Sequence, residues 1–178
     1  EERLNVNLVC ALPGLTTGYG PSHQATDDIA LFRAIPGLTI IDPCDALEIE
    51  QATEAIAAHD GPVYMRLLRG QVPRLLDDYG CTFELGRAQL LRDGGDVMFL
   101  SSGLLTLRTL EVATALAADG VAAGVLHVPT IKPLDEAAIA REAARGGRLV
   151  VAAENHSVVG GLGEAVGAAL LGRGVTCA

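Results

Sequence analysis

The loop that carries His23 is the segment of this chain best suited to chemistry. It lies within GPSHQATDDIALFRAIPGLTIIDPCDA, residues 20–46, directly before a helix predicted from about residue 27. The N–H groups and the dipole of a helix N-terminus favour an anion or a developing oxyanion. An imidazole there can donate to a substrate oxygen or shuttle a proton near neutral pH. The alternative is that His23 only hydrogen-bonds its own loop, while Gln24 and Asp27 serve the loop and the helix cap.

Two features nearer the C-terminal end are similar to functional motifs without completing them. The glycines of 161–163, with Gly167, are spaced like a dinucleotide fingerprint, but no acidic residue follows at the needed distance. Glu154 and His156 form an acid–imidazole pair, for which a structural use is expected.

Metal chemistry has little support in the sequence. No Cys-x-x-Cys pair and no histidine at metal-ligand spacing occurs, so no metal site, and in particular no zinc site, is expected. His59 and His127 have no partner signature and are expected to be incidental. We expect a reduced, cytoplasmic protein with buried thiols at its four scattered cysteines: Cys10, Cys44, Cys81 and Cys177.

The composition restricts the class of protein. Hydrophobic residues make up 49% of the chain, charged residues 20% and aromatic residues 3%, which is typical of a soluble α/β protein. The formal net charge of −9 argues against a nucleic-acid partner, although a few local arginines could still bind phosphorylated small molecules. No apolar run reaches the roughly 18 residues of a membrane span, so no membrane partner is expected, and the first residues do not resemble a signal peptide.

Strands and helices are predicted to alternate along the chain. Runs such as LVVAA, apolar on both faces, suit parallel strands covered by helices, and the alternation implies open, mainly parallel sheets. Asp45, with Glu48 three residues later, is expected to cap the second helix. The predicted strands are 4–10, 38–41, 63–67, 97–101, 123–127 and 149–152, and the predicted helices are 27–34, 45–58, 104–118, 135–145 and 163–171.

These elements predict an α/β fold with two open, mainly parallel sheet units, the first of them truncated. The first strand has no obvious helix before it, so we expect the chain to start in the middle of a domain. The last four residues are expected to start another strand.

The segment 20–46 resembles the transketolase family pattern of Gly-x-Thr/Ser-His-Gln, then Arg-x-Ile-Pro-x-Leu/Met-Thr, then Pro-x-Asp. Further matches follow in the family's order, with GPVYMRLLRG at 61–70, TIKPLDEAAI at 130–139 and AENHSVVGGLGEAV at 153–166. The resemblance implies the C-terminal part of a pyrimidine-binding domain at 1–70, a linker at 71–82 and a transketolase-type C-terminal domain at 83–178.

The resemblance also implies roles for three side chains. His23 takes the position of the histidine that faces thiamine and contacts the sugar's oxygens. Arg69, seven residues after Pro62, takes the position of an arginine that contacts the sugar phosphate, a task suited to the planar guanidinium. Arg66 is a second substrate-binding candidate, with a structural ion pair as its alternative.

The family's cofactor implies parts that this chain does not contain. Thiamine diphosphate and Mg²⁺ require a glutamate upstream of residue 4 and a Gly-Asp-Gly…Asn motif in another domain, and no Gly-Asp-Gly occurs here. The chain alone is therefore expected to be inactive and to need an N-terminal, diphosphate-binding half, with a homodimer contact in addition. Gly18 and Tyr19 stand where relatives often carry an acidic residue that selects sugar stereochemistry, so the usual sugar preference is not expected to carry over.

The function implied by the resemblance is transfer of a two-carbon ketol unit between sugar phosphates. Two alternatives lie within the same enzyme class: a 1-deoxyxylulose-5-phosphate synthase and the β-type component of a 2-oxoacid dehydrogenase. A non-catalytic α/β assembly module is the alternative from another class.

Overall fold

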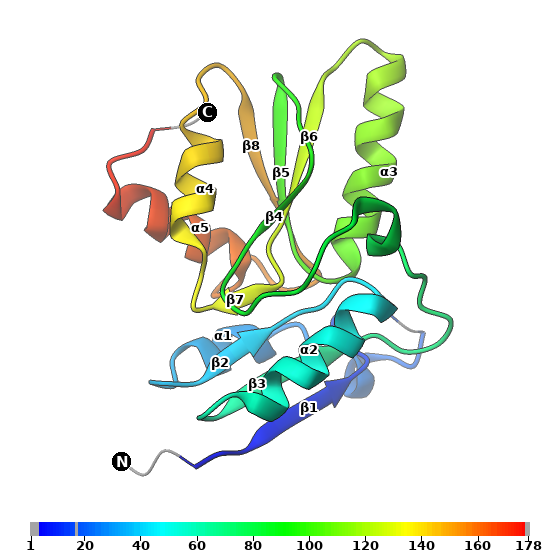
Figure 1. The fold of residues 1–178 in the computed structure, drawn as a ribbon, viewed down its shortest axis with the longest axis vertical. Helices are drawn as coiled ribbons and strands as arrows, with labels where there is room; N and C mark the ends of the chain where they lie inside the picture. The colour runs from blue at the N-terminus through cyan, green and yellow to red at the C-terminus, as the bar shows by residue number, and fades with distance from the viewer. Residues whose placement is uncertain (1–3, 17, 177–178) are drawn as a thin grey trace.

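The computed structural model describes residues 4–16 and 18–176, which form two sheets of four strands each (Figure 1). All neighbouring strands run parallel, except β7 against β2 and β4 against β6. The first sheet contains, in spatial order, β1 (Asn7–Ala11), β3 (Val63–Leu67), β2 (Thr39–Ile41) and β7 (Thr130–Lys132). The second contains β4 (Gln89–Arg92), β6 (Ala123–His127), β5 (Val97–Ser101) and β8 (Leu149–Ala153). The predicted fold class, two mainly parallel α/β units, is confirmed.

Helices cover these sheets. In the C-terminal unit (residues 83–176), α3 lies on one face of the sheet and α4 and α5 on the other (Figure 1). The N-terminal unit (residues 4–70) contains α1 and α2. The bounds are α1 (Asp28–Arg33), α2 (Ala46–Ala58), α3 (Leu104–Ala118), α4 (Glu136–Ala143) and α5 (Leu162–Gly172), with short 3-10 turns η1 (Pro21–His23) and η2 (Leu76–Tyr79). None of the described helices is long and apolar enough to cross a membrane.

Local side chains fix where two of the helices begin. Asp45 is the N-cap of α2, and its Oδ1 accepts from the backbone N–H of Glu48 at 2.7 Å, as predicted from the sequence. Asp135 caps α4 in the same way, through the N–H of Ala138 at 3.0 Å. Each cap satisfies an N–H group that has no partner inside its helix.

The two units share one apolar core. Ile40 of β2 and Tyr64 of β3 belong to the same buried cluster as Leu126 of β6, Ile139 of α4 and Leu162 of α5. Burial of a continuous cluster removes apolar surface of both units from water at once, which stabilises their relative positions.

Two strands were not predicted. β7 has three residues and pairs antiparallel with β2 of the other unit, and β4, QLLR, has polar ends and no apolar run. Neither carries the periodic signal on which a sequence-based assignment depends. The predicted strand at the end of the chain is wrong for residues 175 and 176, which lie in no strand, while 177 and 178 are outside the described residues.

The expected burial of the cysteines is only partly correct. Cys44 is buried, Cys81 is half-buried and Cys10, on β1, is exposed. Cys177 lies outside the described residues.

Candidate active site

Two loops leave the first sheet at one edge. β1 and β3 are parallel neighbours, with Ala11 opposite Leu67, and the backbone N–H of Leu12 donates to the carbonyl of Leu67 at 3.1 Å. In open α/β sheets, ligands bind outside the carboxyl ends of the strands. The loop with His23 follows β1, and the loop with Arg69 follows β3, so both candidates belong to this edge.

His23 is exposed and ends η1. Its Nδ1 lies 3.0 Å from the hydroxyl of Ser22, and its ring centroid lies 5.8 Å from that of Tyr19. Together with Leu12 it lines a pocket of about 380 Å³. No group of the described residues bonds its Nε2, so this nitrogen stays available for a substrate.

Residues 24–27 separate His23 from α1, the helix that follows its loop. His23 is the last residue of η1, and α1 begins at Asp28, one residue after the predicted start at about 27. The dipole effect falls off within the first turn of a helix, so it does not act on His23 here.

Arg69 is exposed, and no group of the described residues bonds its guanidinium. It lines a small pocket of about 180 Å³ together with Thr16 and with Leu104 and Leu107 of α3. His23 and Arg69 thus line separate pockets along one sheet edge. The proposed contact of Arg69 with a sugar phosphate stays a prediction.

Arg66 has a different environment, because its guanidinium is buried and faces inward. Its Nε and Nη2 each donate to a carboxylate oxygen of Asp28 at 2.8 Å, and its Nη1 lies 3.4 Å from Asp42. Its Nη2 also donates to the carbonyls of Ala25 and Asn155, at 3.3 and 3.2 Å. Burial alone would raise the pKa of Asp28, but the Arg66 guanidinium holds it below its usual value. These contacts form the structural ion pair that was the alternative role expected for Arg66. Its contact with substrate stays a prediction.

Asn155, which the sequence reasoning missed, holds the loop that carries His23. Its Oδ1 accepts from the N–H of Leu15 at 2.8 Å, and its Nδ2 donates to the carbonyl of Pro13 at 3.3 Å. Gly14 has a φ of +61°, and a Cβ there would lie 2.3 Å from the Asn155 carbonyl oxygen. Only glycine therefore permits this approach. The C-terminal unit thus helps to fix the loop of the N-terminal unit that carries His23.

Glu154 and His156 make internal contacts. The carboxylate of Glu154 accepts from the N–H groups of Leu162 and Gly163, at 2.6 and 2.9 Å, and so occupies the N-terminus of α5. The Nδ1 of His156 donates to the carbonyl of Ser157 at 2.7 Å. An anionic cofactor at this glycine-rich turn would meet the Glu154 carboxylate.

His127, predicted to be incidental, lies in a buried polar network. Its Nε2 is 2.8 Å from Glu48 Oε2, and its Nδ1 is 2.7 Å from the hydroxyl of Thr106. Cys44, Glu48 and His127 are fully buried, and their potential ligand atoms lie within 4.8 Å of one another. Burial and the negative charge of Glu48 raise the pKa of the Cys44 thiol, which therefore keeps its proton. The network joins α2 to β6.

Two family models match the chain, one after the other. The model of the transketolase pyrimidine-binding domain matches residues 1–74, and the model of the transketolase C-terminal domain matches residues 86–177. The chain belongs to the transketolase family. The resemblance found in the sequence motifs is therefore confirmed, while the exact bounds of the transketolase domains and linker, 1–70, 71–82 and 83–178, stay a prediction.

Several transketolase relatives resemble the chain over most of its length. A transketolase family protein of Sinorhizobium fredii, y4mN, is 71% identical over 171 residues, which cover 96% of the chain and 50% of that relative. The 6-deoxy-6-sulfo-D-fructose transketolase subunit SqwH of a Clostridium species is 46% identical over 163 residues, covering 91% of the chain and 50% of that relative. Deoxyxylulose-phosphate synthases match at lower identity. The chain thus spans about half the length of these two transketolase relatives.

A solved structure has the same transketolase architecture. It is described as a split-gene transketolase, inactive β4 tetramer, and it superimposes with a TM-score of 0.87 at 38% identity, covering 96% of this chain and 54% of that one. This likeness confirms the transketolase-type fold.

Proposed function

We propose that the protein containing this chain transfers a two-carbon ketol unit between sugar phosphates, with thiamine diphosphate and Mg²⁺ as cofactors. One observation supports this function most strongly. His23, the histidine of the Gly-x-Ser-His-Gln motif, is exposed in a pocket at the carboxyl edge of β1, with its Nε2 available. A buried His23, or one whose Nε2 was bonded within the chain, would have contradicted it.

In this proposal the chain supplies the sugar-binding edge. His23 donates a hydrogen bond to a sugar oxygen and moves a proton at that oxygen, which an imidazole can do near neutral pH. Arg69 binds the sugar phosphate through its planar, permanently charged guanidinium. Arg66 positions Asp28 and the end of the His23 loop.

The described residues do not fit a diphosphate–Mg²⁺ group. Mg²⁺ needs several oxygen ligands, but the buried acids at this edge already have partners, and Asp27, which lines the His23 pocket, is a single exposed carboxylate. Asp28 accepts from Arg66 and from the hydroxyl of Tyr64, and Asp42 accepts from the hydroxyl of Ser102 at 2.9 Å. We therefore assign the diphosphate and Mg²⁺ to a part outside this chain and derive no step through them.

The partner in this proposal is an N-terminal, diphosphate-binding half, either a separate subunit or a preceding segment. The active site forms where that half meets the His23 edge, with a homodimer contact through the same domains, and the chain alone is inactive. We propose a cytoplasmic location, as for sugar-phosphate metabolism in general.

Reconstitution tests this function. The chain is mixed with the matching N-terminal half, thiamine diphosphate and Mg²⁺, and given xylulose 5-phosphate and ribose 5-phosphate, with each half alone as the control. Ketol transfer only in the mixture supports the proposal. Release of carbon dioxide from pyruvate with glyceraldehyde 3-phosphate, without ketol transfer, would instead identify a deoxyxylulose-phosphate synthase. If neither reaction occurs and no cofactor binds, the result would favour the non-catalytic assembly module.

A further inference from the structure

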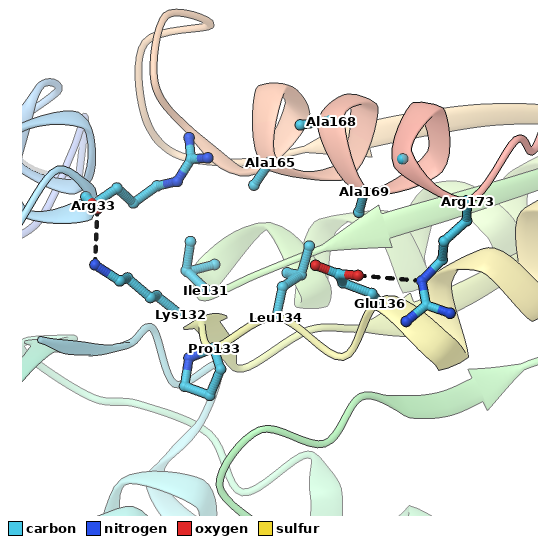
Figure 2. Close-up of a pocket in the computed structure, with 11 residues that line it drawn as sticks. Arg33, Ile131, Lys132, Pro133, Leu134, Glu136, Ala165, Ala168, Ala169 and Arg173 are labelled. Carbon is cyan, nitrogen blue, oxygen red and sulfur yellow. Dashed lines mark hydrogen bonds and ion pairs between the residues drawn. The ribbon is translucent and has the colours of Figure 1, made fainter. Parts of the chain in front are cut away.

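A pocket of about 730 Å³ lies where the two units meet. Its walls are the end of α1, β7 with the turn after it, and one face of α5 (Figure 2). The volume falls within the roughly 300–1,000 Å³ of small-molecule sites. Neither His23 nor Arg69 lines it, so it is distinct from the sugar-binding edge.

Two half-buried cations, Arg33 and Lys132, line this pocket (Figure 2). The Lys132 Nζ donates to the carbonyls of Arg33 and Ile35, at 2.9 and 2.5 Å, and the Arg33 Nη1 donates to the carbonyl of Gly160 at 2.6 Å. Within the described parts of the chain, no carboxylate forms an ion pair with either cation. Burial and the charge of Arg33 lower the pKa of Lys132. The two like charges are thus fixed near each other, and an anion between them would relieve their repulsion.

Apolar side chains line much of the rest of the pocket. Ile131 and Leu134 project toward α5, and Arg173 forms an ion pair with Glu136 at 3.2 Å at the far end (Figure 2). Small side chains leave the opposite wall open: Ala165, Ala168 and Ala169 of α5. An apolar body of a ligand can therefore lie along α5 without displacing a large side chain.

We propose that this pocket binds a small organic anion, a phosphate monoester or a carboxylate with an apolar body, whose charged group lies against Arg33 and Lys132. Guanidinium and ammonium groups both donate charge-assisted hydrogen bonds to such oxygens. Arg33 belongs to the N-terminal unit and Lys132 to the C-terminal unit, so the ligand links the two units. This binding is independent of ketol transfer.

Calorimetric titration of the complete protein with phenyl phosphate tests the site. Three further ligands are compared with it. Benzoate carries a carboxylate in place of the phosphate, inorganic phosphate lacks the apolar body, and benzyl alcohol lacks the charge. We expect saturable binding of phenyl phosphate or benzoate that is tighter than binding of the alcohol. Lys132→Met should weaken it about tenfold or more, since a hydrogen bond to a charged group is lost. Ala168→Phe should weaken phenyl phosphate but leave inorganic phosphate unchanged.

Arg108→Met is the matched control, because it removes one positive charge from an exposed side chain of α3 that does not line the pocket. It should leave the affinity unchanged, and thermal unfolding of each variant reports whether it is folded. No saturable binding of either anion, equal binding of benzyl alcohol, or an equal loss in Arg108→Met would overturn the proposal. Loss of binding in Arg69→Met with none in Lys132→Met would overturn it too, because the anion would then lie at the sugar-binding edge.

Discussion

His127 Nε2 lies 2.8 Å from Glu48 Oε2, although the two residues are 79 positions apart and belong to different units. Both side chains are fully buried. The second nitrogen of His127 is bonded to Thr106, and the second interaction of Glu48 Oε2 is with the N–H of Cys44 at 2.7 Å. Such a satisfied polar contact in a dry interior specifies one arrangement of α2 against β6.

Glu48→Ala should lower the free energy of unfolding by about 3–5 kcal/mol, because it leaves His127 and the Cys44 N–H buried without their acceptor. Urea denaturation measures this. The control is Glu111→Ala, which removes an exposed acid paired with Arg108 and should cost less than about 1 kcal/mol. Equal, small effects of both changes would contradict the importance of the buried contact.

Stability should fall in acid through Asp28. Its folded-state pKa is below the ordinary value, so its contribution is present above roughly pH 4, its unfolded pKa, and is lost as the pH falls through the folded pKa. Asp28→Asn should therefore flatten the dependence of unfolding free energy on pH below about 4. Urea midpoints measured from neutral pH downward test this, with exposed Asp78→Asn as control. A wild-type slope that persists in Asp28→Asn would show that other acids cause it.

His23→Ala in the complete enzyme should lower kcat for ketol transfer by about a hundredfold or more, because a positioned proton donor is removed. His23 is exposed, so the thermal midpoint should not change. His59→Ala, at a histidine away from this edge, is the control. Unchanged turnover in His23→Ala would remove His23 from the site.

Arg69→Ala should raise KM for phosphorylated sugars about tenfold or more, and KM for unphosphorylated sugars much less. The reason is that only the phosphate offers the guanidinium two charged oxygens on one group. Arg87→Ala, another exposed arginine, should affect neither. Equal effects of Arg69→Ala on both classes of sugar would rule out the phosphate contact.

Asn155→Ala should loosen the loop that carries His23, with faster hydrogen exchange at the Leu15 amide and a lower kcat. Asn155→Asp keeps the acceptor for Leu15 but loses the donor to Pro13, so it should retain slow exchange at that amide. A lower kcat with unchanged exchange would mean that Asn155 acts in some other way.

The sequence predicted the elements with strong local signals. The limits of α3, β5 and β6 agree residue for residue, and Asp45 caps α2 as expected, because these features depend on periodicity and on residues a few positions apart. The motifs also singled out His23 and Arg69, whose contacts with substrate stay predictions. The loops that carry these two residues follow β1 and β3. These strands are parallel neighbours, so both loops start at the same edge of the sheet.

Contacts between residues far apart in the sequence could not be predicted from local sequence patterns. Asn155 and Leu15 are 140 positions apart, and nothing in the local pattern around Asn155 distinguishes it from its neighbours Glu154 and His156. The contact between Glu48 and His127 could not be predicted either, because the burial of both side chains depends on how the two units pack. The internal partners of Arg66 likewise come from three separate segments, which contain Asp28, Asp42 and Asn155.

β7 belongs to the C-terminal unit in sequence but completes the sheet of the N-terminal unit beside β2. Exchanging the C-terminal domain between two members of the family would therefore also exchange one strand of the neighbouring domain's sheet. A hybrid whose β7 does not fit would leave β2 as an open edge, which tends to pair with other chains. Recombination within this family is thus expected to succeed mainly where β2 and β7 are inherited together.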